Sequence, residues 1–400
     1  MGRQNSGDPG SRFRLEHTRQ LNPESGPART VNASVFRVLA LGGDGIGPEV
    51  TDAAVTVLEQ AARASGLRIH LEHDLLGGAA YDEHGVFCTD DTVDKATRAN
   101  AVLVGAVGGP QWDQIKIDGG PQDKDGLMRL RQTLNVYAGL RPTRGHPALI
   151  HATPFREGLA EQADVMVVRE LCGGAFFAQP RGIEPVEGGG FRAFDTNLYT
   201  TPEIERIARV AFTLAQRRRG RVTSIDKANV MQSYVLWRQV VENIGLSEYP
   251  DVELELLYAD NAAYQLMRQP AHFDVILGDN LFGDLFSDLA GTITGSLGML
   301  PSASLPGLSR SDDTGAAAIY EPVHGSAPDI AGQGIANPIG AILSVAMMFE
   351  FSFHQPAVAR AIEQAVDRTI EHGTLTPDLG GQATTERVTE QVLAHLAQAD

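Results

Sequence analysis

Two aspartates four residues apart, Asp284 and Asp288, are the most suggestive chemical groups in this 400-residue sequence. Side chains four residues apart share one face of a helix. The surrounding run, residues 279–288, therefore predicts a helix from which both carboxylates project together. Their close neighbours are apolar, namely Leu281, Phe282, Leu285, Phe286 and Leu289. We expect these neighbours to limit solvation, so that a divalent cation relieves the repulsion. Taken alone, the spacing also fits a solvated acidic stripe.

A third carboxylate, Asp260, directly follows a strand-like run at residues 252–257. Carboxylates placed just after strands suit Mg²⁺ or Mn²⁺, which bind oxygen ligands and keep positions open for water and substrate. The sequence therefore predicts a Mg²⁺ or Mn²⁺ site formed by Asp260, Asp284 and Asp288.

Four basic side chains stand at structured positions. Lys227 follows the strand-like run 222–225 and could act as a general base if burial and neighbouring positive charge lower its pKa. Arg131, Arg141 and Arg169 offer planar, bidentate donors of the kind that a substrate with two carboxylates needs. Considered singly, each of the four also fits an ordinary surface charge.

Two glycine-rich segments could contact a nucleotide. The first, residues 42–47, lacks the G-x-G-x-x-G spacing, which argues against a standard Rossmann site. The second, residues 321–338, combines glycine and proline and is too constrained for a simple linker. Its Asp329 could accept hydrogen bonds from a ribose diol.

The elements that must position these groups alternate between strands and helices. Apolar runs predict strands at residues 36–41, 67–73, 101–107, 165–169, 222–225, 252–257 and 274–277. Amphipathic stretches predict helices at residues 49–64, 202–218 and 230–242. This alternation indicates an α/β fold. Residues 176–200 break the pattern with prolines and a run of glycines. We expect a protruding hairpin there, either a long surface loop or a dimerisation element.

Composition narrows the functional classes. The formal charge of −17 argues against nucleic-acid binding through a basic surface, and no apolar run reaches the length of a membrane helix. Two cysteines, Cys88 and Cys172, are too few for a disulfide framework and fit a reducing cytosol. Residues 1–34 have almost no apolar periodicity and are expected to be a disordered tail.

Taken together, these segments resemble the β-decarboxylating dehydrogenases, and within them the isopropylmalate branch, over residues 36–400. The resemblance rests on ordered motifs at residues 42–50, 108–110, 140–142, 169–171, 226–230, 260–263, 281–288, 295–303 and 324–338. It implies an isocitrate/isopropylmalate dehydrogenase-like α/β fold, with two domains around a shared twisted sheet and no standard Rossmann fold. Residues 35–136 and 304–400 would form the first domain, and residues 137–303 the second.

The resemblance also implies a homodimer with shared active sites. Each subunit would lend Lys227 and Asp260 to its partner, whereas Asp284 and Asp288 would hold the metal in their own subunit. The substrate carboxylates would meet Arg131, Arg141 and Arg169. An apolar pocket for the substrate side group would be formed by Leu127, Met128 and Val230, and the cofactor loop by His324, Gly325, Ser326, Ala327, Asp329, Ile330 and Asn337.

The implied activity is oxidative decarboxylation of 3-isopropylmalate with NAD, as in leucine biosynthesis. Asp329 would repel a 2′-phosphate, which favours NAD over NADP. Isocitrate would bury a third carboxylate against Leu127 and Met128, which is costly, so an aliphatic substituent is expected.

Two positions depart from the family pattern. Phe176 stands where the family has a tyrosine that protonates the enolate, and Lys124 where the isopropylmalate enzymes have a glutamate. Lys124 could reach a negative group on an unusual substrate or lie on the surface. For Phe176 three alternatives stay open. Water or another acid protonates the enol, the substrate is another 3-substituted malate of specialised metabolism, or the chain is a weakly catalytic or regulatory subunit.

Overall fold

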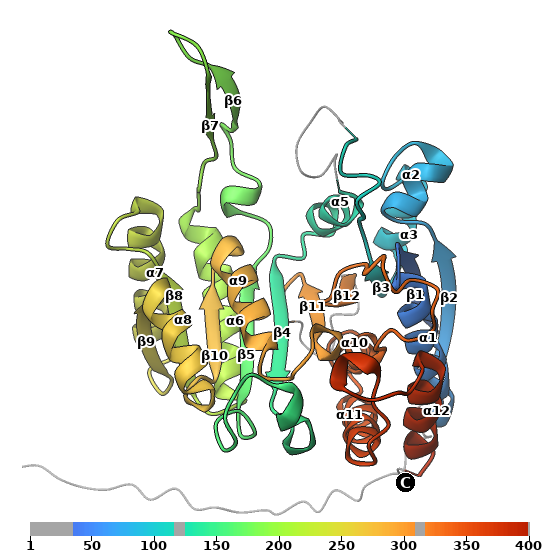
Figure 1. Ribbon diagram of the computed structural model, residues 1–400. Helices are drawn as coiled ribbons and strands as arrows, with labels where there is room; N and C mark the ends of the chain where they lie inside the picture. Colours follow the sequence, from blue (N-terminus) through green and yellow to red (C-terminus); the bar gives the residue numbers. More distant parts are fainter. Residues whose placement is uncertain (1–34, 116–124, 309–316, 399–400) are drawn as a thin grey trace, which may run out of the picture. The chain divides into compact units, whose positions relative to one another are not determined.

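A mixed ten-stranded sheet crosses the part of the chain that the computed structural model describes, residues 35–115, 125–308 and 317–398 (Figure 1). The expected N-terminal tail lies outside these residues. The order of the strands is β2-β1-β3-β12-β11-β4-β5-β10-β8-β9. Their bounds are β1 Val35–Gly43, β2 Arg68–Asp74, β3 Ala101–Ala106, β4 Ala138–Arg144, β5 Asp164–Glu170, β8 Arg221–Asp226, β9 Glu253–Tyr258, β10 Val275–Gly278, β11 Pro301–Leu305 and β12 Ala318–Pro322.

The two flanks of this sheet are parallel, and the strands at its centre are not. β11 runs antiparallel to both β12 and β4, and β4 runs antiparallel to β5. All other neighbouring pairs are parallel. A standard Rossmann sheet has no such antiparallel centre. The expectation of an α/β fold different from the Rossmann fold is therefore confirmed.

Eleven α-helices occur among the described residues. They are α1 Gly47–Ala64, α2 Gly78–His84, α3 Asp90–Arg98, α5 Gly126–Thr133, α6 Thr201–Gln216, α7 Gln232–Glu248, α8 Ala259–Arg268, α9 Asn280–Gly291, α10 Ile339–Phe351, α11 Pro356–Glu371 and α12 Thr385–Leu396. Short 3-10 turns are η1 Pro147–Ala152, η2 Gly174–Phe176, η3 Pro270–His272, η4 Leu297–Met299 and η5 Pro377–Leu379. None of these helices is long and apolar enough to cross a membrane.

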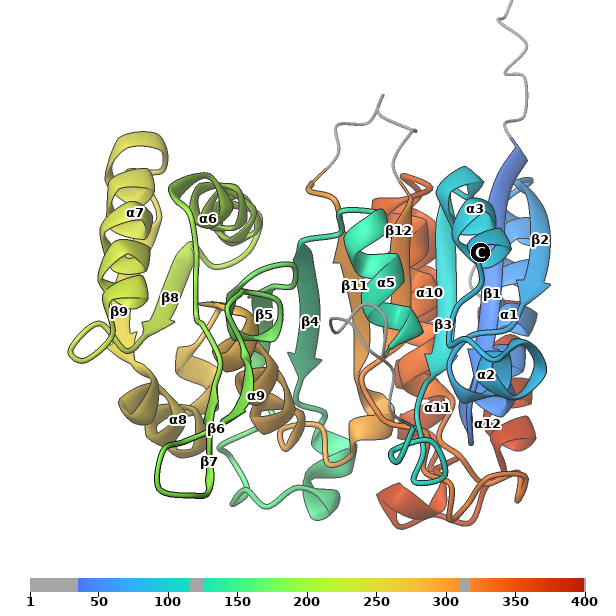
Figure 2. The ribbon, with the colours of Figure 1, turned by 90° about the horizontal axis from the view of Figure 1, so that it is seen from above.

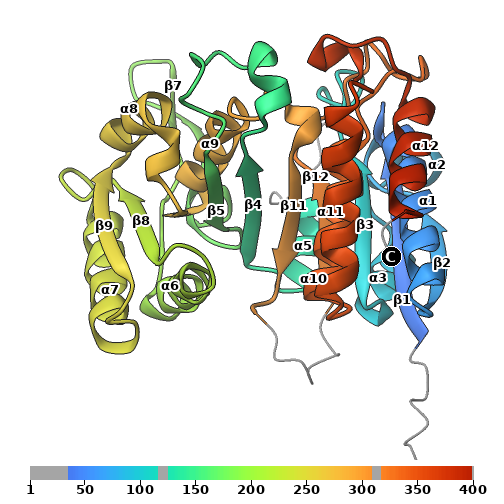
Figure 3. The ribbon, with the colours of Figure 1, turned by 90° about the horizontal axis from the view of Figure 1, so that it is seen from below.

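Two groups of helices pack along the sheet. Helices α1, α10, α11 and α12 pack against one another beside β1, β3 and β12, whereas α6 and α7 pack together beside β8 (Figures 2 and 3). Local chemistry starts several of them. Proline occupies the first turn of α1, where its missing N–H costs nothing. A capping box between Thr200 and Glu203 starts α6.

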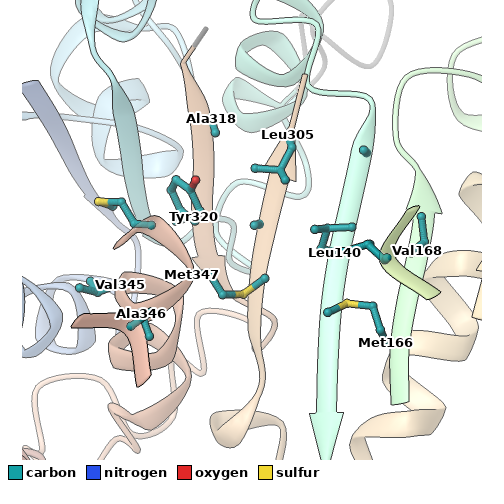
Figure 4. Packing of buried hydrophobic residues seen from close by; sticks show 14 of the residues in the cluster. Leu140, Met166, Val168, Leu305, Ala318, Tyr320, Val345, Ala346 and Met347 are labelled. Atoms are coloured by element: carbon teal, nitrogen blue, oxygen red, sulfur yellow. The ribbon is translucent and has the colours of Figure 1, made fainter. Parts of the chain in front are cut away.

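The largest hydrophobic core lies under the central strands. Leu140 on β4, Met166 on β5 and Leu305 on β11 are buried there with Met347 of α10 (Figure 4). Helix α10 has buried residues on every side, which is typical of a helix enclosed in a core. The core therefore joins the strands on both sides of the antiparallel centre.

All the predicted strands are present, with bounds shifted by one or two residues. The central strands β4, β11 and β12 were not predicted. Each contains a proline, at positions 142, 301 and 322, and proline argues against a strand because it cannot donate to the ladder. The division into two domains stays a prediction, since its boundaries fall at β4 and inside β11, which are hydrogen-bonded neighbours in one sheet.

The predicted hairpin is confirmed. β6 (Gly182–Pro185) and β7 (Phe191–Phe194) form a separate antiparallel ribbon that projects away from the main sheet (Figure 1). Its side chains include Ile183 and Phe191, which are 74% and 77% exposed. Large apolar side chains this exposed call for a covering partner.

Candidate active site

The two aspartates of α9 share one face, as predicted. Asp279 caps the helix by accepting a hydrogen bond from the Phe282 backbone N–H at 2.8 Å. Asp284 and Asp288 then project toward the same guanidinium. Arg141 Nη1 lies 3.5 Å from Asp284 Oδ1 and 3.6 Å from Asp288 Oδ1.

Solvation of this pair is limited only in part, as Asp288 shows. Its side chain is 59% exposed, and the flanking Leu285 is 58% exposed. The reason is that this side of α9 turns away from the core, so much of the Asp288 side chain stays open to solvent. Arginines, in addition to water, offset the repulsion between the two aspartates. Partial burial still raises the pKa of Asp288, Arg141 opposes this shift and Asp284 adds to it.

Arg169, at the end of β5, is held from two sides. Its Nη1 forms an ion pair with Asp284, and its Nε and Nη2 donate to Asn280 Oδ1 at 3.0 and 2.7 Å. Asn280 is fixed in turn, because its Nδ2 donates to the Gly173 carbonyl at 3.0 Å and its backbone N–H donates to the Tyr199 hydroxyl at 2.9 Å. Sequence reasoning missed Asn280, whose role depends on β5 lying beside α9.

Arg131 reaches the same region from α5. It forms a buried ion pair with Glu321 of β12, with side chains 7% and 9% exposed. The Arg131 Nε is buried with no hydrogen-bond partner among the described residues. Glu321 was not singled out from the sequence, because nothing in its local pattern points to an arginine 190 residues away. A buried, partly unsatisfied guanidinium suits an anionic ligand.

The charges of the three arginines act on one another. Burial, together with the neighbouring Arg141 and Arg131 charges, lowers the pKa of Arg169, while Asp284 and Glu321 oppose the shift. Burial and the Arg131 charge likewise lower the pKa of Arg141 against the opposing effect of Asp284. The structure thus brings together the three arginines that the sequence analysis selected.

Phe176 lies at this cluster. It ends η2, and the Arg169 guanidinium carbon lies 5.6 Å from the centre of its ring. This stacking is of cation–π type. The Phe176 ring therefore faces Arg169, and it has no proton to donate. The other departure, Lys124, lies outside the described residues.

Lys227 and Asp260 form a separate pair. They follow β8 and β9 and make an ion pair with each other, with side chains 30% and 71% exposed. The hydrogen bond from Lys227 lowers the pKa of Asp260. Among the described residues, no group of three or more His, Cys, Asp or Glu side chains is placed to hold a metal ion. Within one chain Asp260 therefore does not join Asp284 and Asp288.

The residues expected to form the apolar pocket are also divided. Leu127 and Met128 lie in α5, where Leu127 is packed among core residues of β1 and β3 and Met128 is half-buried. Val230 precedes α7 and is 69% exposed. Figures 1 and 2 show α5 and α7 on opposite sides of β4. One chain does not bring the three together.

The two glycine-rich segments meet in space. The Ile46 backbone N–H donates to the Ser326 carbonyl at 2.8 Å. Gly45 has φ +57°, and a Cβ there would lie 2.0 Å from the same oxygen, so only glycine fits. Asn337, further along the second segment, donates to Asp378 Oδ2 at 3.0 Å. The loop after β12 is thereby anchored to the start of α1 and to η5.

Several groups of this loop have bonding capacity left. His324 Nδ1 lies 2.8 Å from the Gly325 carbonyl, while its Nε2 is buried without a partner among the described residues. Burial lowers the pKa of His324 and keeps the ring neutral. The Asp329 carboxylate is exposed and has no hydrogen bond or ion pair within the described part of the chain. A nucleotide offers hydrogen-bonding groups to both side chains.

Comparisons with known proteins agree with this geometry. Residues 37–392 match the family model described as isocitrate/isopropylmalate dehydrogenase. The 3-isopropylmalate dehydrogenase of Pseudomonas fluorescens is 49% identical over 89% of this chain and 96% of the relative. The enzyme of the same name from Chromohalobacter salexigens is 48% identical over 90% and 98%.

Solved structures show the same relationship. The crystal structure of isocitrate dehydrogenase from Methylococcus capsulatus has a TM-score of 0.78 and 33% identity, covering 90% of this chain and 99% of that one. The apo β-decarboxylating dehydrogenase from Thermococcus kodakarensis has a TM-score of 0.71 and 35% identity, covering 91% and 96%. With both the sequence and the fold matched over nearly their whole length, the chain belongs to the isocitrate/isopropylmalate dehydrogenase family.

Proposed function

We propose that this enzyme catalyses the NAD-dependent oxidative decarboxylation of 3-isopropylmalate to 2-oxo-4-methylpentanoate, the reaction type used in leucine biosynthesis. The observation that carries the proposal is the clustering of Arg131, Arg141 and Arg169, two of which pair with the aspartates of α9 and the third with Glu321. The names of relatives about half identical in sequence support the same substrate. The two unpaired cysteines fit an enzyme of the reducing cytosol.

Charge balance explains why this cluster suits a dicarboxylate. Three guanidinium groups lie among three carboxylates, those of Glu321, Asp284 and Asp288, so the set is close to neutral by itself. A divalent cation adds two positive charges, which match the two carboxylates of a malate. The side chains of Arg131 and Arg169 are buried and held by an ion pair and by hydrogen bonds, respectively. They are therefore already oriented for bidentate contacts.

The donor set fits Mg²⁺ or Mn²⁺. Asp284 and Asp288 supply hard carboxylate oxygens from one helical face, and Asp260 of a second subunit would complete the site. When bound, such a cation lowers the pKa of the substrate hydroxyl and stabilises negative charge on its oxygens. The arginines that hold Asp284 also fix the direction in which its second oxygen points.

Lys227 is the proposed general base. As the neutral amine it would take the proton of the substrate hydroxyl, bound NAD⁺ would supply the hydride acceptor for the carbon that carries this hydroxyl, and the 3-keto acid so formed would lose CO₂. The contact with Asp260 positions the Lys227 nitrogen at the end of β8, beside a proposed metal ligand, and Lys227 acts as a base once this nitrogen is deprotonated. Phe176 donates no proton, so the enolate takes its proton from water.

His324 and Asp329 are proposed to bind the adenosine part of NAD. The Nε2 of His324 and the carboxylate of Asp329, which have no partner among the residues the structure describes, offer one group for the base and one for the ribose diol. A negative charge at Asp329 disfavours the 2′-phosphate of NADP. Ile330 is half-buried next to it and gives the base an apolar surface.

A homodimer is proposed to complete each site. The part of the chain that contains the hairpin and helices α7, α8 and α9 has many exposed apolar side chains. They include Ile183, Phe191, Val230, Met231, Tyr264, Leu281 and Leu285. Such a surface is typical of a large subunit interface. Pairing would bring Lys227, Asp260 and Val230 of one chain to the arginines, Leu127 and Met128 of the other.

Phe176 favours a second candidate, a malate with a different substituent at C3. An NADH-formation screen over 3-isopropylmalate, other 3-alkylmalates, isocitrate and D-malate, with Mn²⁺ or Mg²⁺, decides between the two. We expect 3-isopropylmalate to have the highest kcat/KM, NADP to be used poorly and EDTA to abolish the rate. A higher kcat/KM for another 3-alkylmalate would establish the second candidate. No turnover of any of these compounds would refute both.

A further inference from the structure

A cavity lies on the face of the sheet opposite to the arginine cluster. Alternate residues of a strand point to opposite faces, so Arg141 and Arg169 face the candidate active site while Pro142 and Met166, paired across β4 and β5, face the other way. The cavity behind them has a volume of about 360 Å³. Small-molecule sites commonly have volumes of this order.

The wall of this cavity is largely apolar. It is formed by β4 and β5, by the end of α6 and by α10 and α11, with the apolar side chains Met166, Leu214, Met299, Leu343, Met347, Phe351, Val366 and Ile370. Figure 4 shows Met166 of β5 and Met347 of α10 next to the central strands. Methionines adapt their shape to a ligand at little cost.

Most charged groups at the cavity are already paired. Arg144 forms an ion pair with Asp367, and Arg218 forms ion pairs at 2.8 Å with Asp164 and with the neighbouring Asp274. These groups need no further counter-charge.

Two carboxylates are left over. Glu363 of α11 is half-buried in the wall and has no hydrogen bond or ion pair with any described residue, and the same holds for the exposed Glu350 of α10. Burial, followed by repulsion from Glu350, raises the pKa of Glu363. The remaining cation at the mouth, Arg217, is exposed and also unpaired within the described part of the chain. The charges of Arg144 and Arg360 oppose the pKa shift of Glu363 without forming an ion pair with it. Among the lining charged groups that lack a hydrogen bond or ion pair in the described part of the chain, the most buried is thus a carboxylate.

We propose that this cavity is a ligand site, separate from the active site, for a small primary ammonium ion with an apolar body. The ammonium group donates to Glu363 and Glu350, and the body lies against the methionine and leucine side chains. An ammonium carries three donors, enough for both carboxylates and one water. The ligand could be a free amine or an apolar amino acid, whose own carboxylate would then face Arg217.

Three probes with the same branched body separate these possibilities in calorimetric titrations of the full chain. We expect isopentylamine to bind saturably and 4-methylpentanoate, which has a carboxylate in place of the ammonium, to bind at least about tenfold more weakly, since each charged hydrogen bond contributes that much. Leucine binding more tightly than isopentylamine identifies an amino-acid site, and leucine binding more weakly identifies an amine site. The proposal is overturned if isopentylamine shows no saturable binding, or if 4-methylpentanoate binds equally well.

Matched variants locate the binding. Glu363→Gln and Glu350→Gln keep the shape of the side chain and should each raise the Kd of isopentylamine about tenfold. Glu83→Gln, on exposed α2, removes the same charge elsewhere and should leave the Kd unchanged. Leu343→Trp fills the cavity and should abolish binding. NADH formation by each variant verifies its fold. An unchanged Kd in Glu363→Gln would rule this site out.

Discussion

The arginine cluster and the Lys227–Asp260 pair are both built from charged side chains, yet they are built differently. Arg131 and Arg169 are buried and anchored to Glu321, Asp284 and Asn280 within one chain. The side chains of Lys227 and Asp260 are partly or largely exposed, and among the described residues each forms an ion pair only with the other. The first set is organised by the fold of a single chain. The second set has room for a further partner.

This contrast has an energetic consequence. A buried ion pair is costly to break because the remaining charge is left in a medium that solvates it poorly. An exposed pair contributes little to stability. Substitution of Lys227 should therefore lower activity with little loss of stability. Substitutions in the arginine cluster should lower stability as well as activity.

The largest effect is expected for Lys227→Met. Loss of a general base should lower kcat by about 10²–10⁴-fold, whereas the free energy of unfolding should change by less than about 1 kcal/mol because the pair is exposed. Steady-state kinetics and urea unfolding measure the two quantities. A variant with near-normal kcat would assign proton removal to another group.

Arg131→Met should lower stability as well as activity. It leaves Glu321 buried without its counter-charge, which should cost about 3–5 kcal/mol of unfolding free energy. Arg129→Met is the matched control, since Arg129 pairs with Asp90 at the surface, where the two side chains are 35% and 92% exposed. Equal losses of stability in the two variants would show that the burial of Arg131 is unimportant.

Arg169→Lys keeps the charge and removes the planar fork that holds both Asn280 and Asp284. We expect kcat/KM to fall about 10²-fold, mostly through KM for the dicarboxylate, because a bidentate site is not served by an ammonium. Arg209→Lys, which changes an exposed ion pair on α6, should leave kcat/KM unaltered. An Arg169→Lys enzyme with unchanged KM would contradict the proposed substrate role.

The smallest effect is expected for Phe176→Tyr. The ring lies beside Arg169, a proposed substrate ligand, and a new proton donor there should raise kcat by about tenfold or more. Phe177→Tyr, in the next and equally half-buried position, is the control. An unchanged kcat would mean that protonation of the enolate does not limit the rate.

Local patterns predicted what depends on local spacing. The shared face of Asp284 and Asp288, the hairpin and the flanking strands follow from periodicity and turn residues, and the structure has them. The resemblance selected Arg131, Arg141 and Arg169, which the structure brings together.

Features that depend on the tertiary fold were missed. The proline-containing central strands are stabilised by neighbours on both sides of the sheet, and no local pattern encodes those neighbours. Asn280 and Glu321 acquire their roles only because α9 and β12 lie beside the arginines. The degree of exposure of Asp288 did not follow from its flanking leucines, since a helical face can carry leucines without being fully buried.

The central claim, that each active site is divided between two chains, is tested most directly by mixing two inactive variants. Lys227→Met and Asp284→Asn are each expected to lack activity as purified proteins. After denaturation and joint refolding at equal amounts, half of the dimers combine the two chains, and one of their two sites contains both native residues. The account predicts recovery of about a quarter of the wild-type NADH-formation rate. No recovery, despite formation of mixed dimers, would contradict it.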